Sequence, residues 1–311
     1  MTTIFIGNVW VLVLLARFRR LRNCANYFTA SMAFADFLLS IALIPGVKIT
    51  FDPTFISNIN LCLMLWCSQI FASTMSVLSL LCVSIDRLVK IVKPLRYQTI
   101  VTEERTLVVI FLIWTYGTFS VVVLPFAGLR NDDVLCFDFA HFFNFFHLHV
   151  LFLLNGFLPF IIILAMYMYM FKIVSGKHVS AKQFEPTSLR SYSIWKRELK
   201  TLSNLALIIG FTGVAWLPSI TLVLIDLHIP TLQASLTART ILSWFTYLNS
   251  AVNPIVYALR SEQFKTATMQ LLKRDLSSVC QKFVTTRRNR VHPSGDTTVR
   301  RARVIQTDST T

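Results

Sequence analysis

Charged side chains are scarce in this sequence. Only 14% of the residues are Asp, Glu, Lys or Arg, whereas an ordinary soluble domain carries about 25%. Hydrophobic residues make up 54% of the chain, and its mean hydropathy is +0.60. This composition excludes an ordinary soluble domain and indicates a membrane protein.

Signatures of catalysis and transport are also lacking. No nucleophile and base form a recognisable set, and no histidines have the spacing of a metal site, so an enzyme is disfavoured. His141, His147 and His149 fall in or beside a predicted outer loop, where we expect them to cap a helix or face solvent. The chain has neither an inverted repeat nor paired broken helices, which many transporters have. A transporter is kept as the alternative from a different class.

Seven apolar runs approach the roughly 20 residues that a membrane-spanning helix needs. They are centred on residues 4–16, 27–47, 61–85, 107–126, 147–171, 202–226 and 240–258. The first run has only 16 residues from Met1 to Ala16, or about 24 Å of helix, so we expect this span to be truncated. A signal peptide is the weaker interpretation, because no basic segment precedes the run and no small-residue cleavage site follows it.

Basic residues distinguish the two sides of the predicted bundle. The sequence contains 30 Lys and Arg residues, and all except Lys48, Arg130 and Arg239 fall on one side. Because basic residues are retained in the cytoplasm, we predict that the N-terminus lies outside and the C-terminus inside. Anionic membrane lipid then accounts for the net charge of +15, and no nucleic-acid partner is expected.

Polar residues recur at helical spacing within the third span. Gln69, Ser73 and Ser76 share one face, and polar side chains inside a span usually face the bundle interior or a water-filled cavity. Ser79 and Ser84 have the simpler interpretation of joining helices by hydrogen bonds. The third span is therefore predicted to line a cavity.

Other spans also contain isolated polar residues. Asp36 lies near the middle of the second span, where an unpaired carboxylate costs on the order of several kcal/mol. We expect it to be protonated, hydrogen-bonded or bound to a cation. In the seventh span, Asn249, Asn253 and Tyr257 recur every fourth residue, and Pro254 loosens the helix beside them.

Asp86 and Arg87 end the third span at the predicted cytoplasmic surface. Glu198 begins the sixth span at the same depth and offers Arg87 a partner. A charge-assisted contact of this kind is worth about 1 to 3 kcal/mol. The simpler alternative is that Arg87 and Glu198 are solvated charges at the membrane surface.

Together these residues resemble the rhodopsin-like (class A) G-protein-coupled receptors over nearly the whole chain. Each predicted span carries a family marker, in the family's order: "GNV" with Asn8, "AFAD" with Asp36, "IDR" with Arg87, Trp114, Pro159, "WLP" with Trp216 and Pro218, and "NPIVY" from Asn253 to Tyr257. Two segments, "SIDRLVKIVKPLRYQTIVTEER" and "NSAVNPIVYALR", look most like adenosine receptors and their amine- and melatonin-receptor relatives.

The resemblance implies an all-α membrane protein with a seven-transmembrane helix bundle over residues 1–260. A short amphipathic eighth helix would follow on the cytoplasmic membrane surface over 261–273, and then a disordered basic tail over 274–311. A disulfide between Cys62 and Cys136 is implied outside the membrane. The protein would be a multi-pass receptor of the plasma membrane without a cofactor, and its partners would be membrane lipid, an extracellular ligand, a heterotrimeric G protein, arrestin and a receptor kinase.

The resemblance also implies an allosteric sodium site and an activation switch. Asp36, Ser76, Asn249 and Asn253 match the family's sodium pocket, a set of oxygen ligands suited to a hard cation; a protonated, hydrogen-bonded Asp36 is the alternative. The implied switch residues are Asp86, Arg87, Glu198, Tyr167, Asn253, Pro254 and Tyr257. Thr212 departs from the pattern, since a packed Phe is common there.

The expected ligand class depends on which groups the pocket lacks. Gln69 stands where amine receptors place a carboxylate, Tyr247 where a retinal receptor needs lysine, and Val223 where adenosine receptors use an Asn. We therefore expect a small, uncharged organic ligand. The expected lining residues are Gln69, Ser73, Phe137, Leu151, Asn155, Trp216, Ser219, Ile220, Val223, Ser243 and Tyr247. The alternative is a short peptide whose basic group reaches Asp132, Asp133, Asp138 or Asp226.

Overall fold

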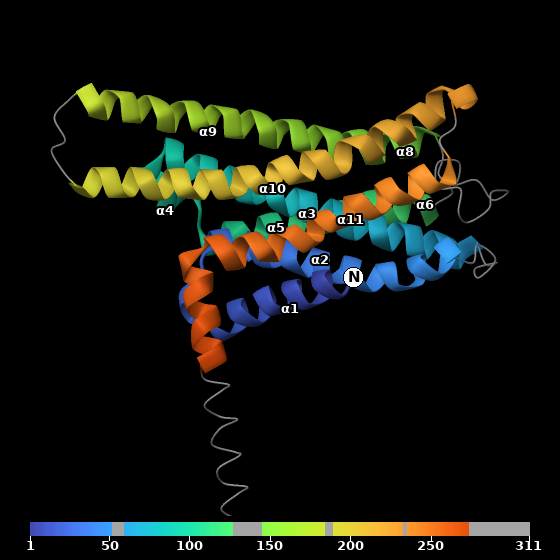
Figure 1. Ribbon diagram of the computed structural model, residues 1–311, viewed down its shortest axis with the longest axis horizontal. Helices are drawn as coiled ribbons and strands as arrows, with labels where there is room; N and C mark the ends of the chain where they lie inside the picture. The colour runs from blue at the N-terminus through green and yellow to red at the C-terminus, as the bar shows by residue number, and fades with distance from the viewer. Residues whose placement is uncertain (52–58, 127–144, 184–188, 233–234, 274–311) are drawn as a thin grey trace, which may run out of the picture. The chain divides into compact units, whose positions relative to one another are not determined.

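The computed structural model describes residues 1–51, 59–126, 145–183, 189–232 and 235–273. These residues form helices and short connections, with no strand in the described part of the chain. Seven long helical segments follow one another along it (Figure 1). They are α1 (Thr2–Arg17), α2 (Cys24–Phe51), α3 (Ile59–Val92), α5 (Glu103–Gly117) continued by η4 (Thr118–Val123) and α6 (Leu124–Phe126), α8 (Phe145–Phe152) continued by η5 (Leu153–Phe157) and α9 (Leu158–Gln183), α10 (Leu189–His228) and α11 (Leu236–Arg260).

Shorter helical elements complete the described chain. They are η1 (Arg19–Leu21), η3 (Pro94–Arg96), α4 (Tyr97–Ile100), η6 (Pro230–Leu232) and a helix over residues 262–273. The chain divides into two compact units, Met1–Phe264 and Lys265–Thr311. All the sites described below lie in the first unit.

Several helices extend beyond the apolar runs that predict them. Helix α3 begins at Ile59 and continues to Val92, and α10 begins at Leu189. Apolar composition marks the part of a helix that fits the hydrocarbon core, whereas backbone hydrogen bonding continues into the polar flanks. The seven predicted spans are therefore confirmed in number and order, but their ends differ.

Two spans contain a π-helical turn just before a proline. Turn η4 precedes Pro125, and turn η5 precedes Pro159. A proline ring collides with the carbonyl of the residue four positions earlier, which is Val121 in η4 and Asn155 in η5. A widened turn moves that carbonyl aside, so each π-turn has a local cause in the sequence.

Helix α3 lies inside the bundle. It packs against α2, α5, η4, η5 and α9, and it buries side chains from Cys62 to Ile91. Helix α1 contacts both α2 and α11, which closes the bundle. Helix α5 instead exposes large apolar side chains such as Phe111 and Leu112, a surface that suits lipid rather than water.

Four helices of the described chain are long and apolar enough to cross a membrane. They are Cys24–Val47, Glu103–Phe126, Phe146–Ser175 and Ala206–Asp226. Thr2–Arg17 is a shorter apolar helix. Length and hydropathy therefore identify these four spans more strongly than the other three.

Candidate functional site

A cavity of about 250 Å³ lies between helices of the bundle. Side chains from α2, α3, α8, η5, α10 and α11 line it. The structure brings together around this cavity all but one of the residues that the sequence predicts for a ligand pocket. They are Gln69, Ser73, Leu151, Asn155, Trp216, Ser219, Ile220, Val223, Ser243 and Tyr247; Phe137 lies outside the described residues.

A hydrogen bond joins two sides of the cavity. The Tyr247 hydroxyl, from α11, donates to Gln69 Oε1, from α3, over 2.7 Å. A Cβ atom at Gly46 of α2 would lie 3.1 Å from Gln69 Nε2, so glycine leaves room for that amide. Gln69 is thus held between helices, with its carbonyl oxygen already accepting a hydrogen bond from Tyr247.

Asn155 presents a hydrogen-bond donor without a partner. Its Oδ1 accepts a 2.6 Å hydrogen bond from the Tyr116 hydroxyl of α5, while its buried Nδ2 has no partner among the described residues. Asn155 is only 2% exposed, lies in the π-turn η5 and lines the cavity. A buried unpaired donor favours binding of a ligand that carries an acceptor.

An ion pair also lines the cavity. Arg239 Nε of α11 lies 3.0 Å from Asp226 Oδ2 of α10, and the Asp226 side chain is 1% exposed. The predicted pocket lining omitted both residues, although the peptide alternative named Asp226. It also omitted Trp66 and Trp244, which line the cavity. The helical spacing of three residues from Gln69 and Tyr247 could have identified these two tryptophans.

Asp36 is fully buried at a junction of α2, α3 and α11. Ser250 Oγ donates to its Oδ1 over 2.6 Å, and Asn253 Nδ2 donates to its Oδ2 over 2.8 Å. Ser76 also hydrogen-bonds to this carboxylate. The cluster therefore joins two spans to Asp36, and Ser250 is a member that sequence analysis missed.

Asn249, a predicted sodium ligand, makes a different contact. Its Oδ1 accepts a 2.9 Å hydrogen bond from Thr212 Oγ1 of α10. Asn249 and Ser250 are consecutive on α11 and therefore point about 100° apart, toward different helices. Asn253 Oδ1 is buried and has no hydrogen-bond partner among the described residues. This acceptor, together with Asp36 and Ser76, provides an oxygen set compatible with sodium.

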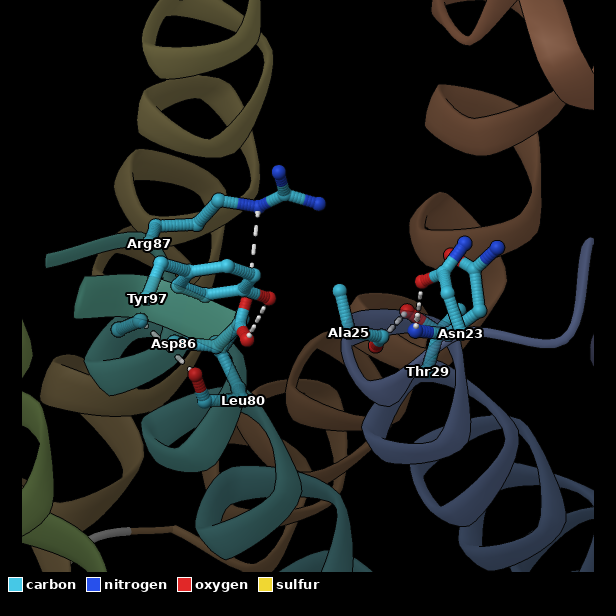
Figure 2. Close-up of polar contacts among 9 residues, drawn as sticks. Asn23, Ala25, Thr29, Leu80, Asp86, Arg87 and Tyr97 are labelled. Atoms are coloured by element: carbon cyan, nitrogen blue, oxygen red, sulfur yellow. Dashed lines mark hydrogen bonds and ion pairs between the residues drawn. The ribbon is translucent and has the colours of Figure 1, made fainter. Parts of the chain in front are cut away.

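Asp86 is buried in the last third of α3 and makes two polar contacts (Figure 2). The Tyr97 hydroxyl of α4 donates to Asp86 Oδ1 over 2.7 Å, and Arg87 Nε lies 3.9 Å from Asp86 Oδ2. Burial and the hydrogen bond to Asp86 raise the pKa of Tyr97 above its ordinary value. Tyr97 was not among the predicted switch residues, and it makes the shorter contact.

The remaining predicted switch residues lie on three helices. Tyr167 is buried in α9, and Pro254 lies within α11. The side chains of Glu198 and Tyr257 lie outside the described part of the chain. The proposed contact between Arg87 and Glu198 thus remains a prediction.

The predicted serine contacts between helices have different outcomes. Ser79 Oγ lies 2.9 Å from Ser31 Oγ of α2, and Trp114 Nε1 donates to the same Ser31 oxygen over 2.9 Å. Ser79 therefore joins helices, as predicted. Ser84 instead donates to the Leu80 carbonyl of its own helix, so the prediction for Ser84 is wrong.

The expectation that His147 caps a helix or faces solvent is also wrong. Helix α8 begins at Phe145, which places His147 within the helix, where it is 1% exposed. His149 is half-buried and lies 3.3 Å from His228 of α10, measured between their Nε2 atoms. His141 lies outside the described residues.

Comparison with known proteins connects these features to a family. The family model described as "7 transmembrane receptor (rhodopsin family)" matches residues 7–257. The chain belongs to this family. Rhodopsin-family proteins are receptors rather than enzymes, which confirms the prediction that the chain is not an enzyme, and they are multi-pass membrane proteins.

Two relatives show how far the similarity extends within the rhodopsin family. The chain is 29% identical to the adenosine receptor A2b of Bos taurus over 301 residues, which cover 86% of this chain and 85% of that receptor. It is 28% identical to the alpha-1A adrenergic receptor of Oryctolagus cuniculus over 307 residues, which cover 86% of this chain. The match covers only 65% of that adrenergic receptor, less than two thirds of its length.

In this rhodopsin-family chain, Cys62 at the start of α3 is disulfide-bonded. Its partner lies outside the described residues, so the pairing with Cys136 remains a prediction. Cys24, Cys67 and Cys82 are free. The disulfide therefore involves the first cysteine of α3 and leaves the two deeper cysteines as packing residues.

Proposed function

We propose that the chain is a receptor of the plasma membrane that binds a small, uncharged organic ligand in the cavity and activates a heterotrimeric G protein. The cavity is the observation that carries this proposal. Its lining includes Trp216, Trp244 and Tyr247, and most of its exposed surface is apolar, a combination typical of small-molecule sites.

The arrangement of charge favours an uncharged ligand. Asp226 and Arg239 are the charged lining residues of the described cavity, and they neutralise one another across 3.0 Å. Gln69 occupies the position of the amine-receptor carboxylate and is engaged by Tyr247. A cationic amine would therefore have to compete with Arg239 for Asp226.

The same ion pair disfavours the peptide alternative. A basic peptide group would have to displace Arg239 before it could reach Asp226. The other acidic residues considered for this role, Asp132, Asp133 and Asp138, lie outside the described residues. Membership of a receptor family disfavours the transporter alternative.

The distribution of Lys and Arg supports an orientation of the receptor in the membrane. We place the N-terminus outside and the C-terminus in the cytoplasm, so that the parts of α3 and α10 that carry Asp86, Arg87 and Glu198 lie on the G-protein side. Arrestin and a receptor kinase would act on the same face, and anionic membrane lipid would contact its basic residues. Residues 262–273 would form the eighth helix at that surface.

A second proposal assigns sodium to the cluster around Asp36. Asp36, Ser76 and Asn253 would supply oxygen ligands, and Ser250 would hold the carboxylate in place. Asn249 would join only if it gave up its contact with Thr212. Sodium would favour the resting state because it holds α2, α3 and α11 together.

A ligand screen tests the receptor proposal. Cells that express the chain are exposed to matched sets of uncharged and cationic organic compounds, with cAMP and calcium as readouts. We expect responses to members of the uncharged set that are absent in cells without the chain. Responses confined to cationic compounds or basic peptides would contradict the proposed ligand class.

A further inference from the structure

Two histidines from different spans meet at the ends of α8 and α10. His149 lies in α8, and His228 is the last residue of α10. Their Nε2 atoms are 3.3 Å apart. Their ring centroids are 5.0 Å apart, and their planes cross at 83°. The contact joins residues that are far apart in the sequence.

The separation of these nitrogens matches that of two ligands on one metal ion. Zinc binds imidazole nitrogen at about 2.0 to 2.1 Å with tetrahedral geometry, which sets two ligand nitrogens about 3.3 to 3.4 Å apart. We propose that His149 and His228 form a two-histidine site for Zn²⁺ or a similar transition-metal ion, with water completing the coordination.

The protonation of His228 suits this role. Its Nδ1 lies 2.9 Å from the backbone carbonyl oxygen of Leu224. A carbonyl oxygen only accepts, so Nδ1 carries the proton and Nε2 of the neutral ring keeps its lone pair. Metal-binding histidines are commonly oriented by a hydrogen bond of this type.

Without a metal, His149 Nε2 must then supply the proton shared with His228. On metal binding this proton leaves Nε2, and the His149 ring takes the tautomer protonated at Nδ1. His149 is half-buried and His228 is exposed, so small ring rotations can direct both lone pairs at one ion. The exposure of His228 also leaves room for water ligands.

The chemistry of the pair selects the class of metal. Imidazole suits zinc, copper and nickel, whereas magnesium and calcium prefer oxygen ligands. Asp226 lies two residues before His228, but Arg239 holds its carboxylate, so it is not counted as a ligand. Two protein ligands give a reversible site rather than a permanent structural one.

Binding of a metal would join two elements that border the cavity. Leu151 of α8 and Val223 of α10 both line it. An ion bound by His149 and His228 would fix the distance between these helices at one end. We therefore expect zinc to stabilise the bundle as well as to bind it.

The test uses the purified chain in lipid nanodiscs and measures Zn²⁺ binding by calorimetry. We expect His149→Asn and His228→Asn each to weaken zinc binding at least about tenfold, and the double variant to lose little more than either single variant. His228→Cys should retain binding because sulfur also ligates zinc. His292→Asn, in the tail, is the matched control and should bind as the unmodified chain does.

Thermal unfolding provides the second readout. Zinc should raise the unfolding temperature of the unmodified chain and of His228→Cys but not that of the double Asn variant, while Mg²⁺ should have no such effect. Equal zinc binding by the unmodified chain and the double Asn variant would overturn the proposal. So would equal stabilisation of the two by zinc.

Discussion

The side chain of Asn155 has one atom that is hydrogen-bonded within the protein and one that is available to a ligand. Its carbonyl oxygen is held by Tyr116, and its amide nitrogen lines the cavity without a partner in the described structure. A buried donor left unpaired costs about 1 to 3 kcal/mol. A ligand that accepts a hydrogen bond from Nδ2 would recover that free energy.

Replacing Asn155 with Leu should therefore weaken ligand binding about 2- to 13-fold, since a hydrogen bond contributes about 0.5 to 1.5 kcal/mol net. The matched control is Tyr116→Phe, which removes the bond to Oδ1 but leaves Nδ2 in place. Competition binding with a compound found in the screen provides the measurement. An equal loss in both variants would show that Asn155 acts only through helix packing.

Tyr97 contributes to stability by donating to the buried carboxylate of Asp86. Tyr97→Phe should lower the free energy of unfolding by about 1.5 to 3 kcal/mol, because a hydrogen bond to a charged group is lost. The raised pKa of Tyr97 keeps its hydroxyl protonated below the ordinary value of about 10. Its contribution is therefore full below that pH and is lost as pH rises through the higher pKa of the folded state.

Thermal unfolding of Tyr97→Phe and the unmodified chain, measured from pH 6 to 9, checks this account. The difference in stability should be constant over that window. Tyr27→Phe, which removes a hydroxyl bonded to Glu103 at an exposed position, is the control and should cost less. A loss for Tyr97→Phe no larger than that of the control would show that the contact with Asp86 is unimportant.

At the scale of helices and turns, the sequence predicts the spans better than their rotation. Long apolar runs specify the order of the seven spans, because each span must lie in the hydrocarbon core. The apolar runs do not specify which neighbouring helix each side of a span contacts. Asn249 and Ser250 differ by one position, and only packing against α2 and α10 decides that Ser250 contacts Asp36 while Asn249 contacts Thr212.

Contacts between distant segments were similarly unpredictable. Asp226 with Arg239 and His149 with His228 meet because α10 ends beside α11 and α8. The π-turn at Asn155 was not predicted either, because the backbone's response to the clash with the Pro159 ring can be seen only in three dimensions. By contrast, the polar face of α3 with Gln69 was predictable from helical spacing alone.

The cluster that joins α2, α3 and α11 leads to a prediction about sodium. If Asp36 binds sodium only while α11 keeps this position, then sodium and an activating ligand oppose one another, and the effect is reciprocal. Replacing N-methylglucamine by sodium should lower the affinity of an activating ligand several-fold. Binding measured in the two salts at equal ionic strength checks this.

Asp36→Asn should remove the difference between the two salts. Thr212→Val is the control, because Thr212 contacts Asn249 and not Asp36, and it should keep the sodium effect. Equal affinities in the two salts for the unmodified chain would reject the cation site. Asp36 would then be a hydrogen-bonding residue that its described partners already satisfy.

In the molecule as a whole, the proposed activation requires the bundle to open at the face where α3 ends. The proposed contact between Arg87 and Glu198 would join α3 to α10 in the resting state only. Glu198→Ala should therefore raise ligand-independent signalling several-fold, since about 1 kcal/mol changes a two-state ratio roughly fivefold. Basal cAMP and calcium, measured at equal surface expression, check this, with Glu104→Ala on α5 as the control. Unchanged basal signalling would contradict the lock.

We propose that a ligand in the cavity drives G-protein activation. Nucleotide exchange on purified heterotrimeric G proteins is measured with the reconstituted chain and an uncharged compound from the screen. We expect the compound to accelerate exchange with the unmodified chain. Val223→Trp, which fills the cavity, should abolish this response and leave basal exchange in place. Acceleration that is unaffected by Val223→Trp, or no acceleration of any G protein by a compound that binds, would contradict the account.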